Sequence, residues 1–198
     1  MADAGRVIAG SARGVRLAAP GPRTRPLTDR VKQTLFGILE PDLEGASVLD
    51  LFAGSGAGGI EALSRGAASA VFVEKDAGAV RVIGENLRRT RLEVGATVVR
   101  RDAIVWLAAA AATMPGGAGR PFDIVLVDPP YADTAALVRV LELVGPVVRE
   151  GGTVVSKHFW RDAPPAHIGL LASERERRFG ETALTFYRRI GPGEAGQA

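Results

Sequence analysis

From residue 47 onward, short apolar segments of strand length alternate with longer segments of helical periodicity. Five strands are expected, at residues 47–52, 69–74, 96–100, 122–127 and 153–157. Their nearly continuous apolar character is typical of parallel strands that helices cover on both faces. Two further strands, 174–178 and 183–189, flank a short turn and predict a final antiparallel hairpin. The pattern therefore predicts an α/β fold with a seven-stranded, mostly parallel sheet.

The N-terminal residues follow a different pattern, with scattered Gly, Pro and Arg and two short alternating runs around residues 11–14. We expect these runs to form a small β-hairpin. Thr28 is the expected N-cap of a following helix that Pro41 ends. We therefore predict three parts: an N-terminal basic hairpin extension at 1–26, the main domain at 27–190 and a disordered tail at 191–198.

The charge of the chain is distributed unevenly. The formal net charge is +3, but residues 1–32 alone carry +5 and the remaining residues carry −2. A basic segment on a near-neutral body is typical of a polyanion-binding protein, because Lys and Arg gain affinity from phosphates by releasing counterions. The alternative is a basic arm that is merely solvated.

Several classes of protein are disfavoured by what the sequence lacks. There is no cysteine, which excludes disulfides, thiolate zinc sites and cysteine nucleophiles. The two histidines, His158 and His167, have no metal-ligand spacing, so we expect no metal. There is also no apolar stretch long enough for a membrane-spanning helix and no apolar signal core near the N-terminus. We expect a cytoplasmic protein without a membrane partner.

A glycine-rich turn follows the first strand of the alternating region, at residues 50–59. Gly54, Gly56 and Gly59 match G-x-G-x-x-G, and Glu74 lies twenty residues after Gly54. Glycines at such a turn allow the backbone to approach a ligand closely, and a carboxylate at this distance can bind a ribose diol. The pattern suits both a dinucleotide and S-adenosylmethionine.

Asp50 distinguishes between these two cofactors. A carboxylate at the end of the first strand would repel a pyrophosphate at the helix N-terminus, whereas it would attract the ammonium of S-adenosylmethionine. The alternative role of Asp50 is to cap the turn. Asp102, after the third strand of the alternating region, is placed to accept from an adenine amino group or to cap the next helix. S-adenosylmethionine is therefore the expected cofactor.

The tetrapeptide Asp128-Pro129-Pro130-Tyr131 follows the fourth strand of the alternating region. Ligands of open parallel sheets bind beyond the carboxyl ends of the strands, where we expect this loop to lie beside the glycine-rich turn. A carboxylate and a carbonyl without competing backbone donors suit a planar group that bears NH₂, and Tyr131 offers a face for stacking. The motif therefore predicts methylation of an exocyclic amino group of a nucleic-acid base. The alternative is a rigid turn in which Tyr131 only packs.

The sequence also resembles a known family, the RsmD-type methyltransferases that modify guanine N2 in 16S ribosomal RNA. The resemblance extends from residue 6 to about 189, and its N-terminal blocks are specific to the family. It rests on residues 6–17, 25–36, 50–58, 61–67, 73–76 and 128–131. Three positions depart from the family's pattern: Leu27, Gln33 and the strand end at 156–160, where the family's pattern predicts an acidic residue.

The resemblance implies a Rossmann-like class I methyltransferase that acts on a small-subunit particle, and we expect it to be a monomer. The cofactor-binding residues would be Asp50, Phe52, Gly54, Ser55, Gly56, Glu74, Lys75, Asp102 and Ala103. The catalytic residues would be Asp128, Pro129, Pro130 and Tyr131. The RNA-binding residues would be Arg13, Arg16, Arg25, Thr28, Arg30 and Lys32.

Three alternatives remain open at this point. The same chemistry serves adenine N6 in DNA or a glutamine side chain in a protein, although the N-terminal blocks argue against both. The glycine pattern alone also fits an NAD-dependent oxidoreductase. A non-catalytic RNA-binding module would have no use for cofactor and acceptor motifs together.

Overall fold

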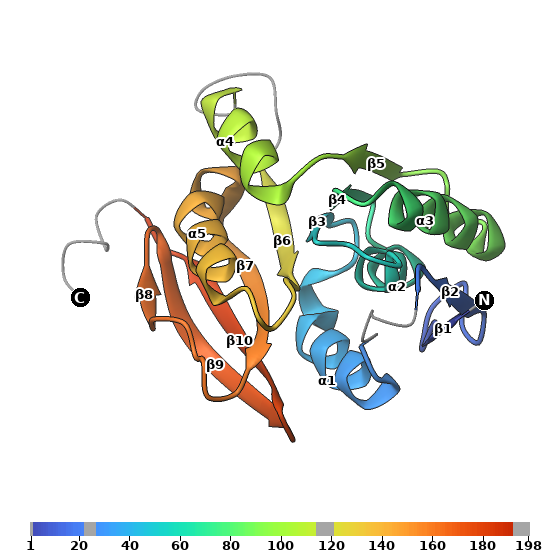
Figure 1. Ribbon diagram of the computed structural model, residues 1–198, viewed down its shortest axis with the longest axis horizontal. Coiled ribbons are helices and arrows are strands. Elements are labelled where there is room, and N and C mark those ends of the chain that lie inside the picture. Colours follow the sequence, from blue (N-terminus) through green and yellow to red (C-terminus); the bar gives the residue numbers. More distant parts are fainter. Residues whose placement is uncertain (1, 22–26, 114–120, 192–198) are drawn as a thin grey trace. The chain divides into compact units, whose positions relative to one another are not determined.

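The computed structural model describes residues 2–21, 27–113 and 121–191. Two compact units divide the chain, the N-terminal unit at residues 1–102 and the C-terminal unit at residues 103–198 (Figure 1). The expected loop at 116–119 and all but the first residue of the expected tail lie outside the described residues. Among the described helices, none has the length and apolarity needed to cross a membrane.

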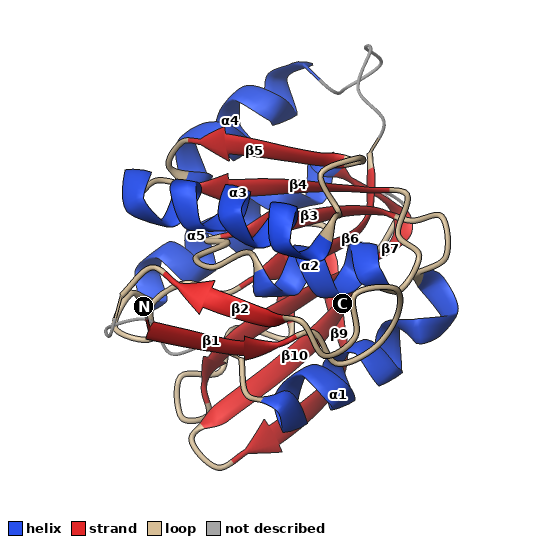
Figure 2. Cartoon of the chain, turned by 90° about the vertical axis from the view of Figure 1, so that its right-hand side faces the viewer, coloured by secondary structure: helices blue, strands red, loops and turns tan. Residues whose placement is uncertain are grey.

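The N-terminal unit contains three parallel strands in the order β5-β4-β3 (Figure 2). They are β3 (Ser47–Leu51), β4 (Ser69–Glu74) and β5 (Ala96–Arg100). Helix α2 (Ala57–Ser64) packs on β3 and β4, and α3 (Ala77–Thr90) packs on β4 and β5. Strand β3 is almost fully buried, as its continuous apolar sequence predicted. The carboxyl ends of these strands hold most of the expected cofactor residues.

Two helices of this unit, α1 and α3, begin at side-chain caps. Thr28 precedes α1 (Asp29–Leu39), and its hydroxyl oxygen accepts from the Val31 amide at 3.4 Å, so the expected N-cap is confirmed. Pro41 lies in the 3₁₀ turn η1 (Glu40–Asp42) that follows, as its missing amide hydrogen requires. Asp76 caps α3 in the same way, accepting from the Ala79 amide at 2.8 Å.

The N-terminal hairpin forms, but its strands lie further from the turn than we expected. They are β1 (Ala2–Arg6) and β2 (Arg16–Ala19), and they pair antiparallel. Only part of the expected runs is in the strands, and the Val7 amide still donates to the Val15 carbonyl at 2.9 Å. The amides of Ile8 and Ala9 donate instead to a side chain of α2 and not to a partner strand. A tertiary contact therefore ends the β ladder early.

The C-terminal unit combines parallel and antiparallel strands. Its elements are α4 (Ala103–Thr113), β6 (Phe122–Val127), α5 (Thr134–Val144), η2 (Gly145–Val147), β7 (Val148–Phe159), β8 (His167–Ile168), β9 (Leu171–Phe179) and β10 (Thr182–Arg189). Strands β6 and β7 are parallel, while β10 pairs antiparallel with both β7 and β9.

All seven expected strands are present, with two differences in this unit. Strand β7 begins five residues early and α5 ends before residue 148, because Gly145 and Pro146 interrupt the helix. The two-residue strand β8 was not expected, and it pairs with the first residues of β9. Beyond that short pairing the Ser173 amide donates to the Ala166 carbonyl at 2.7 Å, and no other strand of the described residues pairs with the outer edge of β9.

Candidate active site

The glycine-rich turn leaves β3 through an unusual backbone path. Phe52, Gly54 and Gly56 have φ values of +58°, +55° and +77°, all in the left-handed region. Glycine adopts this region without penalty, but a bulky residue such as Phe52 does so only under strain. Strained residues of this kind are concentrated at ligand-binding turns. The amide of Gly56 closes the turn by donating to the Ala53 carbonyl at 2.7 Å, and Gly56 is the N-cap of α2.

The last glycine of the pattern serves packing. A Cβ on Gly59 would lie 2.4 Å from the nearest ring carbon of Phe72, so α2 approaches β4 this closely only because the residue is glycine. The amide of Gly59 donates to the Asp50 carboxylate at 2.8 Å, and Asp50 is 4% exposed. This geometry agrees with the capping alternative for Asp50, which stabilises the N-terminus of α2.

Glu74 joins the ends of two chain segments. One carboxylate oxygen accepts from the Gly54 amide at 2.9 Å and the other from the Asp76 amide at 2.8 Å. A carboxylate oxygen has two lone pairs, so each retains the capacity to accept from one hydroxyl of a ribose. The carbonyl of Glu74 accepts from the amide of Arg101, which places half-buried Asp102 at the same strand ends. Lys75 is exposed, and buried Ala103 begins α4 in the other unit.

Asn86 connects the N-terminal hairpin to the glycine-rich turn. Its side-chain oxygen accepts from the Ala18 amide at 2.8 Å, and its side-chain nitrogen donates to the carbonyls of Ala18 and Ser55, both at 2.9 Å. The residue is completely buried. An unsatisfied amide would be costly at such a position, and here three hydrogen bonds satisfy it. The position of Ser55 is therefore held by a side chain of α3.

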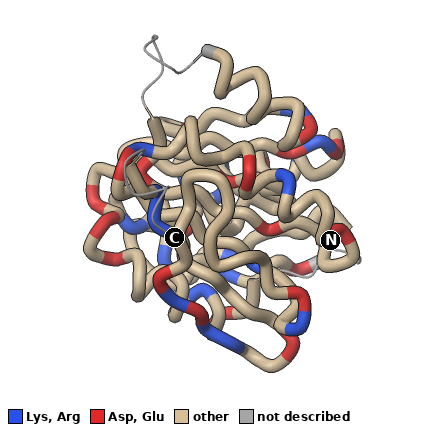
Figure 3. Tube along the Cα trace, turned by 90° about the vertical axis from the view of Figure 1, so that its left-hand side faces the viewer, with Lys and Arg blue, Asp and Glu red and all other residues tan. Residues whose placement is uncertain are grey.

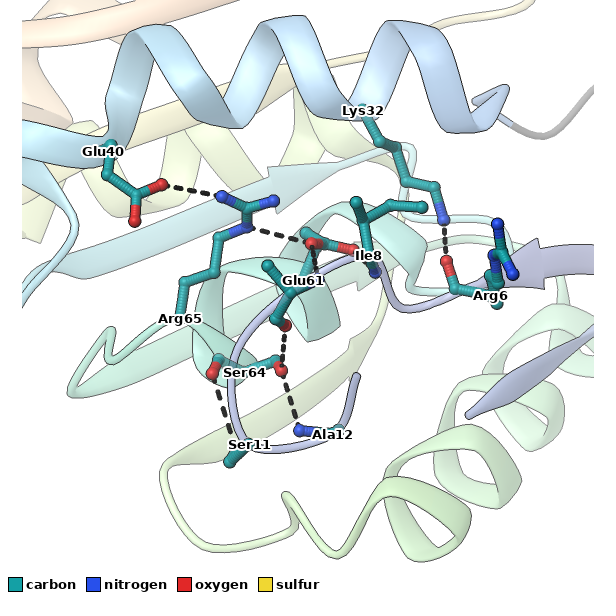
Figure 4. A network of polar contacts seen from close by, with 10 residues as sticks. Arg6, Ile8, Ser11, Ala12, Lys32, Glu40, Glu61, Ser64 and Arg65 are labelled. Carbon is teal, nitrogen blue, oxygen red and sulfur yellow. Dashed lines mark hydrogen bonds and ion pairs between the residues drawn. The ribbon is translucent and has the colours of Figure 1, made fainter. Parts of the chain in front are cut away.

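The loop between β1 and β2 is fixed on α2 by two side chains (Figure 4). The Glu61 carboxylate accepts from the amides of Ile8 and Ala9 at 2.8 and 3.0 Å. The Ser64 hydroxyl donates to the Ala9 carbonyl at 2.6 Å and accepts from the Ala12 amide at 3.0 Å. A Cβ on Gly10 would lie 1.7 Å from the carbonyl oxygen of Ser64, so only glycine fits there. We call Glu61 and Ser64 the loop clamp.

Buried charges extend the loop clamp. Arg65, with an 8% exposed side chain, forms ion pairs with Glu61 at 2.9 Å and with Glu40 at 2.7 Å. Lys32 is completely buried, and its ammonium donates to the Arg6 carbonyl. Burial lowers the pKa of Lys32, although Glu61 and Asp29 oppose the shift. The structure therefore places Lys32 inside the N-terminal unit, beneath the hairpin.

The other residues expected to bind RNA lie differently. Arg13, Thr28 and Arg30 are exposed, and Arg25 lies outside the described residues. Arg16 is exposed too, and it forms an ion pair with Asp3 at 2.8 Å. Such exposed pairs are worth about 0–1 kcal/mol, so Arg16 can exchange Asp3 for another anion at little cost.

In the C-terminal unit, an ion pair holds the first residue of the tetrapeptide. The Lys157 ammonium lies 2.5 Å from the Asp128 carboxylate, and the Lys157 side chain is 10% exposed. Burial raises the pKa of Asp128, while the charge and hydrogen bond of Lys157 oppose the shift. Lys157 is thus the cation that favours the charged form of this carboxylate, against the effect of burial.

Tyr131 is fixed at the same strand ends. Its hydroxyl group lies 2.6 Å from the hydroxyl oxygen of Thr182, the first residue of β10. The Lys157 ammonium lies over its ring, 5.2 Å from the ring centre. Pro129 is buried and Pro130 is exposed. The loop therefore presents a carboxylate, a carbonyl and an aromatic ring from a single rigid segment.

Sequence reasoning did not assign roles to Lys157, Thr182, Asn86, Glu61 or Ser64. A signal existed for Lys157: in the parallel register Val127 lies opposite Ser156, so the next residues, Asp128 and Lys157, lie side by side. The family's pattern predicts an acidic residue at this strand end, and the structure places a cation there. The roles of Asn86 and Glu61 depend on segments that are 31 to 68 residues away, and no local pattern marks them.

Comparison with known proteins identifies relatives that span almost the whole chain. The family model described as Conserved hypothetical protein 95 matches residues 5–188. The Ribosomal RNA small subunit methyltransferase D of Escherichia coli K12 is 38% identical over 196 residues, which cover 96% of this chain and 92% of that protein.

Two solved structures show the same fold. That of the E. coli protein yhhF has a TM-score of 0.78 at 34% identity and covers 94% of this chain and 98% of its own. That of a hypothetical protein from Thermus thermophilus has a TM-score of 0.75 at 40% identity, with 91% and 97% covered. The expected class I methyltransferase fold is therefore confirmed, and the chain belongs to the RsmD family of methyltransferases.

Proposed function

We propose that this protein transfers a methyl group from S-adenosylmethionine to the N2 amino group of a guanine in 16S ribosomal RNA. The observation that carries the proposal is the Asp128 carboxylate, which Lys157 holds in the Asp-Pro-Pro-Tyr segment at the end of β6. Family membership supports the methyltransferase class, and the E. coli relative is by name a small-subunit ribosomal RNA methyltransferase.

The N-terminal unit supplies a turn that suits the cofactor. S-adenosylmethionine supplies an activated methyl group on a sulfonium. Glu74 accepts from the ribose hydroxyls with the lone pairs that its two backbone contacts leave available. The left-handed turn at Gly54 and Gly56 allows the backbone to approach the ligand, and Asp102 accepts from the adenine amino group. Phe52, Ser55 and Lys75 line the same strand ends in this proposal, and Ala103 follows Asp102 directly in the chain.

The acceptor chemistry depends on two hydrogen bonds. The amino nitrogen of guanine is a poor nucleophile because its lone pair is delocalised into the ring. When the Asp128 carboxylate and the Pro129 carbonyl both accept from its N–H groups, the nitrogen is oriented and becomes more pyramidal and nucleophilic. Tyr131 stacks on the base. Catalysis then depends mainly on positioning and electrostatics, with no covalent intermediate.

The RNA partner is a small-subunit particle in this proposal, and the protein acts on it as a cytoplasmic monomer. Arg13, Arg16, Arg25, Thr28 and Arg30 provide its N-terminal contacts. Lys32 supports the hairpin from beneath and does not contact RNA, because its ammonium is buried against the Arg6 carbonyl.

The direct test is a methylation assay with labelled S-adenosylmethionine and small-subunit particles from a strain that lacks the endogenous enzyme, followed by mapping of the modified base. The proposal expects one N2-methylguanine. Double-stranded DNA and a glutamine-containing peptide are offered in parallel, and label in either would favour the alternative acceptor. Calorimetry with NADH tests the oxidoreductase alternative, because an NAD-dependent oxidoreductase must bind NADH.

We expect Asn86→Asp to weaken the binding of S-adenosylmethionine about tenfold. Aspartate retains the acceptor for the Ala18 amide but loses both donors, so the Ser55 carbonyl in the cofactor turn loses its partner. Calorimetry measures the change. The control is Glu85→Gln on the same helix, which removes only the exposed ion pair with Arg89. Unchanged cofactor affinity in Asn86→Asp would show that this hydrogen bond does not hold the turn.

Charge reversal at Arg13 and Arg16 together is expected to weaken binding to small-subunit RNA and to flatten its salt dependence. Each lost phosphate contact lowers the slope of log K against log salt by about 0.7–0.9. Filter binding at several salt concentrations measures both quantities. Arg139→Glu on α5 is the control, because this exposed arginine already pairs with Glu142. An equal loss per reversed charge in both variants would mean that only net charge matters.

A further inference from the structure

We propose that Trp160, Arg161 and Arg178 form an RNA-stacking platform in the C-terminal unit. The Arg178 guanidinium carbon lies 3.5 Å from the centre of the Trp160 ring, and that of Arg161 lies 4.8 Å from it. We call these three residues the tryptophan platform. It deepens the proposed function and rests on it, because it adds a second contact surface for the same RNA.

The backbone around the tryptophan platform holds it in place. The amide of Trp160 donates to the Glu181 carbonyl at 3.1 Å, and the Nε of Arg178 donates to the Gly180 carbonyl at 3.0 Å. Gly180 forms the tight turn between β9 and β10 with a φ of +61°. The Phe159 ring packs beside Trp160, with ring centres 6.3 Å apart. The indole is therefore held from β7 and the guanidinium from β9, so little freedom is lost when a ligand binds.

The two arginines remain available to an anion. Both are exposed, and within the described residues neither forms an ion pair with a carboxylate. Basic and acidic residues are interspersed along the chain (Figure 3) and also within β9, where Glu174 forms an ion pair with Arg188. Arg178 uses one N–H on the Gly180 carbonyl and keeps the others. A guanidinium over an indole suits RNA because it stacks on a base with its plane and binds a phosphate with its edge.

The tryptophan platform lies at the same sheet end as the acceptor segment. Thr182 contacts the Tyr131 hydroxyl at 2.6 Å. In the sheet register Thr182 lies opposite Phe159, the residue before Trp160, and opposite Phe179, the residue after Arg178. A nucleotide flanking the target guanine is therefore within reach of the platform while the target lies at Tyr131. Unpaired bases recognised in this way are typical of RNA-binding proteins.

The test compares three variants in binding to small-subunit RNA, all with methylation measured in the same preparation. Trp160→Ala is expected to weaken binding about tenfold, as loss of one stacked base does. Arg178→Lys keeps the positive charge but loses the planar guanidinium. We expect its RNA affinity to fall about threefold while the salt dependence of binding stays unchanged. Arg177→Ala is the matched control: it removes one charge from the adjacent position of the same strand, whose side chain points to the opposite face.

Tryptophan fluorescence supplies a direct readout. The chain has two tryptophans, and Trp106→Phe leaves Trp160 as the only emitter while preserving an aromatic contact with Phe122. RNA is expected to quench this emission, and Arg178→Lys is expected to reduce the quenching. Wild-type protein that methylates the RNA, together with Trp160→Ala and Arg178→Lys that bind normally, would overturn the platform alone. Failure of wild type to methylate any RNA would instead overturn the proposed function.

Discussion

Asp128→Asn is expected to lower the rate of methyl transfer about 100-fold or more, while the affinity for S-adenosylmethionine stays close to that of wild type. Asparagine has nearly the same shape, but it lacks the negative charge that strengthens a hydrogen bond to the amino group as it becomes cationic. Single-turnover assays with small-subunit particles measure the rate, and calorimetry measures cofactor affinity. A rate within twofold of wild type would remove Asp128 from the catalytic residues.

The control for this variant lies in the same loop. Asp133→Asn also neutralises a carboxylate, but that side chain caps α5 by accepting from the Ala136 amide at 3.0 Å. Asparagine is as good a cap as aspartate, so neither stability nor methyl transfer should change. If Asp133→Asn slowed the reaction as much as Asp128→Asn, the effect would reflect the charge of the loop as a whole.

The same residue gives the reaction a pH dependence with a defined sign. The Asp128 carboxyl group accepts hydrogen bonds at both of its oxygens only when it is ionised, because the protonated group carries an O–H donor. Burial raises the pKa of this group. The rate should therefore fall as the pH falls, with an inflection above the ordinary carboxyl range. Lys157 lowers the pKa of Asp128, so Lys157→Met should move this inflection to higher pH. A profile measured on wild type and Lys157→Met tests this, and a shift to lower pH would contradict it.

Glu61→Ala is expected to destabilise the protein by about 3–5 kcal/mol. The Glu61 side chain is 1% exposed, and its removal leaves Arg65 with a buried charge and the Ile8 and Ala9 amides without acceptors. A fully buried donor left unsatisfied costs about 1–3 kcal/mol, so these two part-buried amides add to the loss of the buried ion pair. Denaturant unfolding measures the change, and limited proteolysis should show that cleavage begins in the loop between β1 and β2.

A matched variant separates this clamp from the ion pair beside it. Glu40→Gln removes the exposed partner of the same Arg65 and should cost about 0–1 kcal/mol. Comparable losses of unfolding free energy in Glu40→Gln and Glu61→Ala would show that the stabilisation comes from the ion pairs of Arg65. If Glu61→Ala lost much of its unfolding free energy while the loop between β1 and β2 still resisted proteolysis, the carboxylate would stabilise α2 and not the hairpin.

The N-terminal basic segment shows how tertiary contacts change the meaning of a charge pattern. Counted along the chain, it carries an excess of five positive charges. In the structure, Lys32 is buried, while Arg6 and Arg16 pair with Asp29 and Asp3. The excess of five already counts both aspartates, so it is the burial of Lys32 that lowers the exposed charge of this segment. The exposed arginines around Trp160 therefore become relevant to RNA binding.

Local patterns in the sequence determined the strands, the helices and the motifs. Periodicity and glycine positions reflect constraints that act within a few residues, such as side-chain alternation and the φ values of a turn. For that reason the seven strands of the alternating region and the Thr28 cap were found along the chain, although the hairpin strands and the start of β7 were displaced by several residues. Only the tertiary structure decided that Glu61 binds the amides of Ile8 and Ala9. It also decided that Asn86 joins β2 to the cofactor turn, because these partners meet only when the chain has folded.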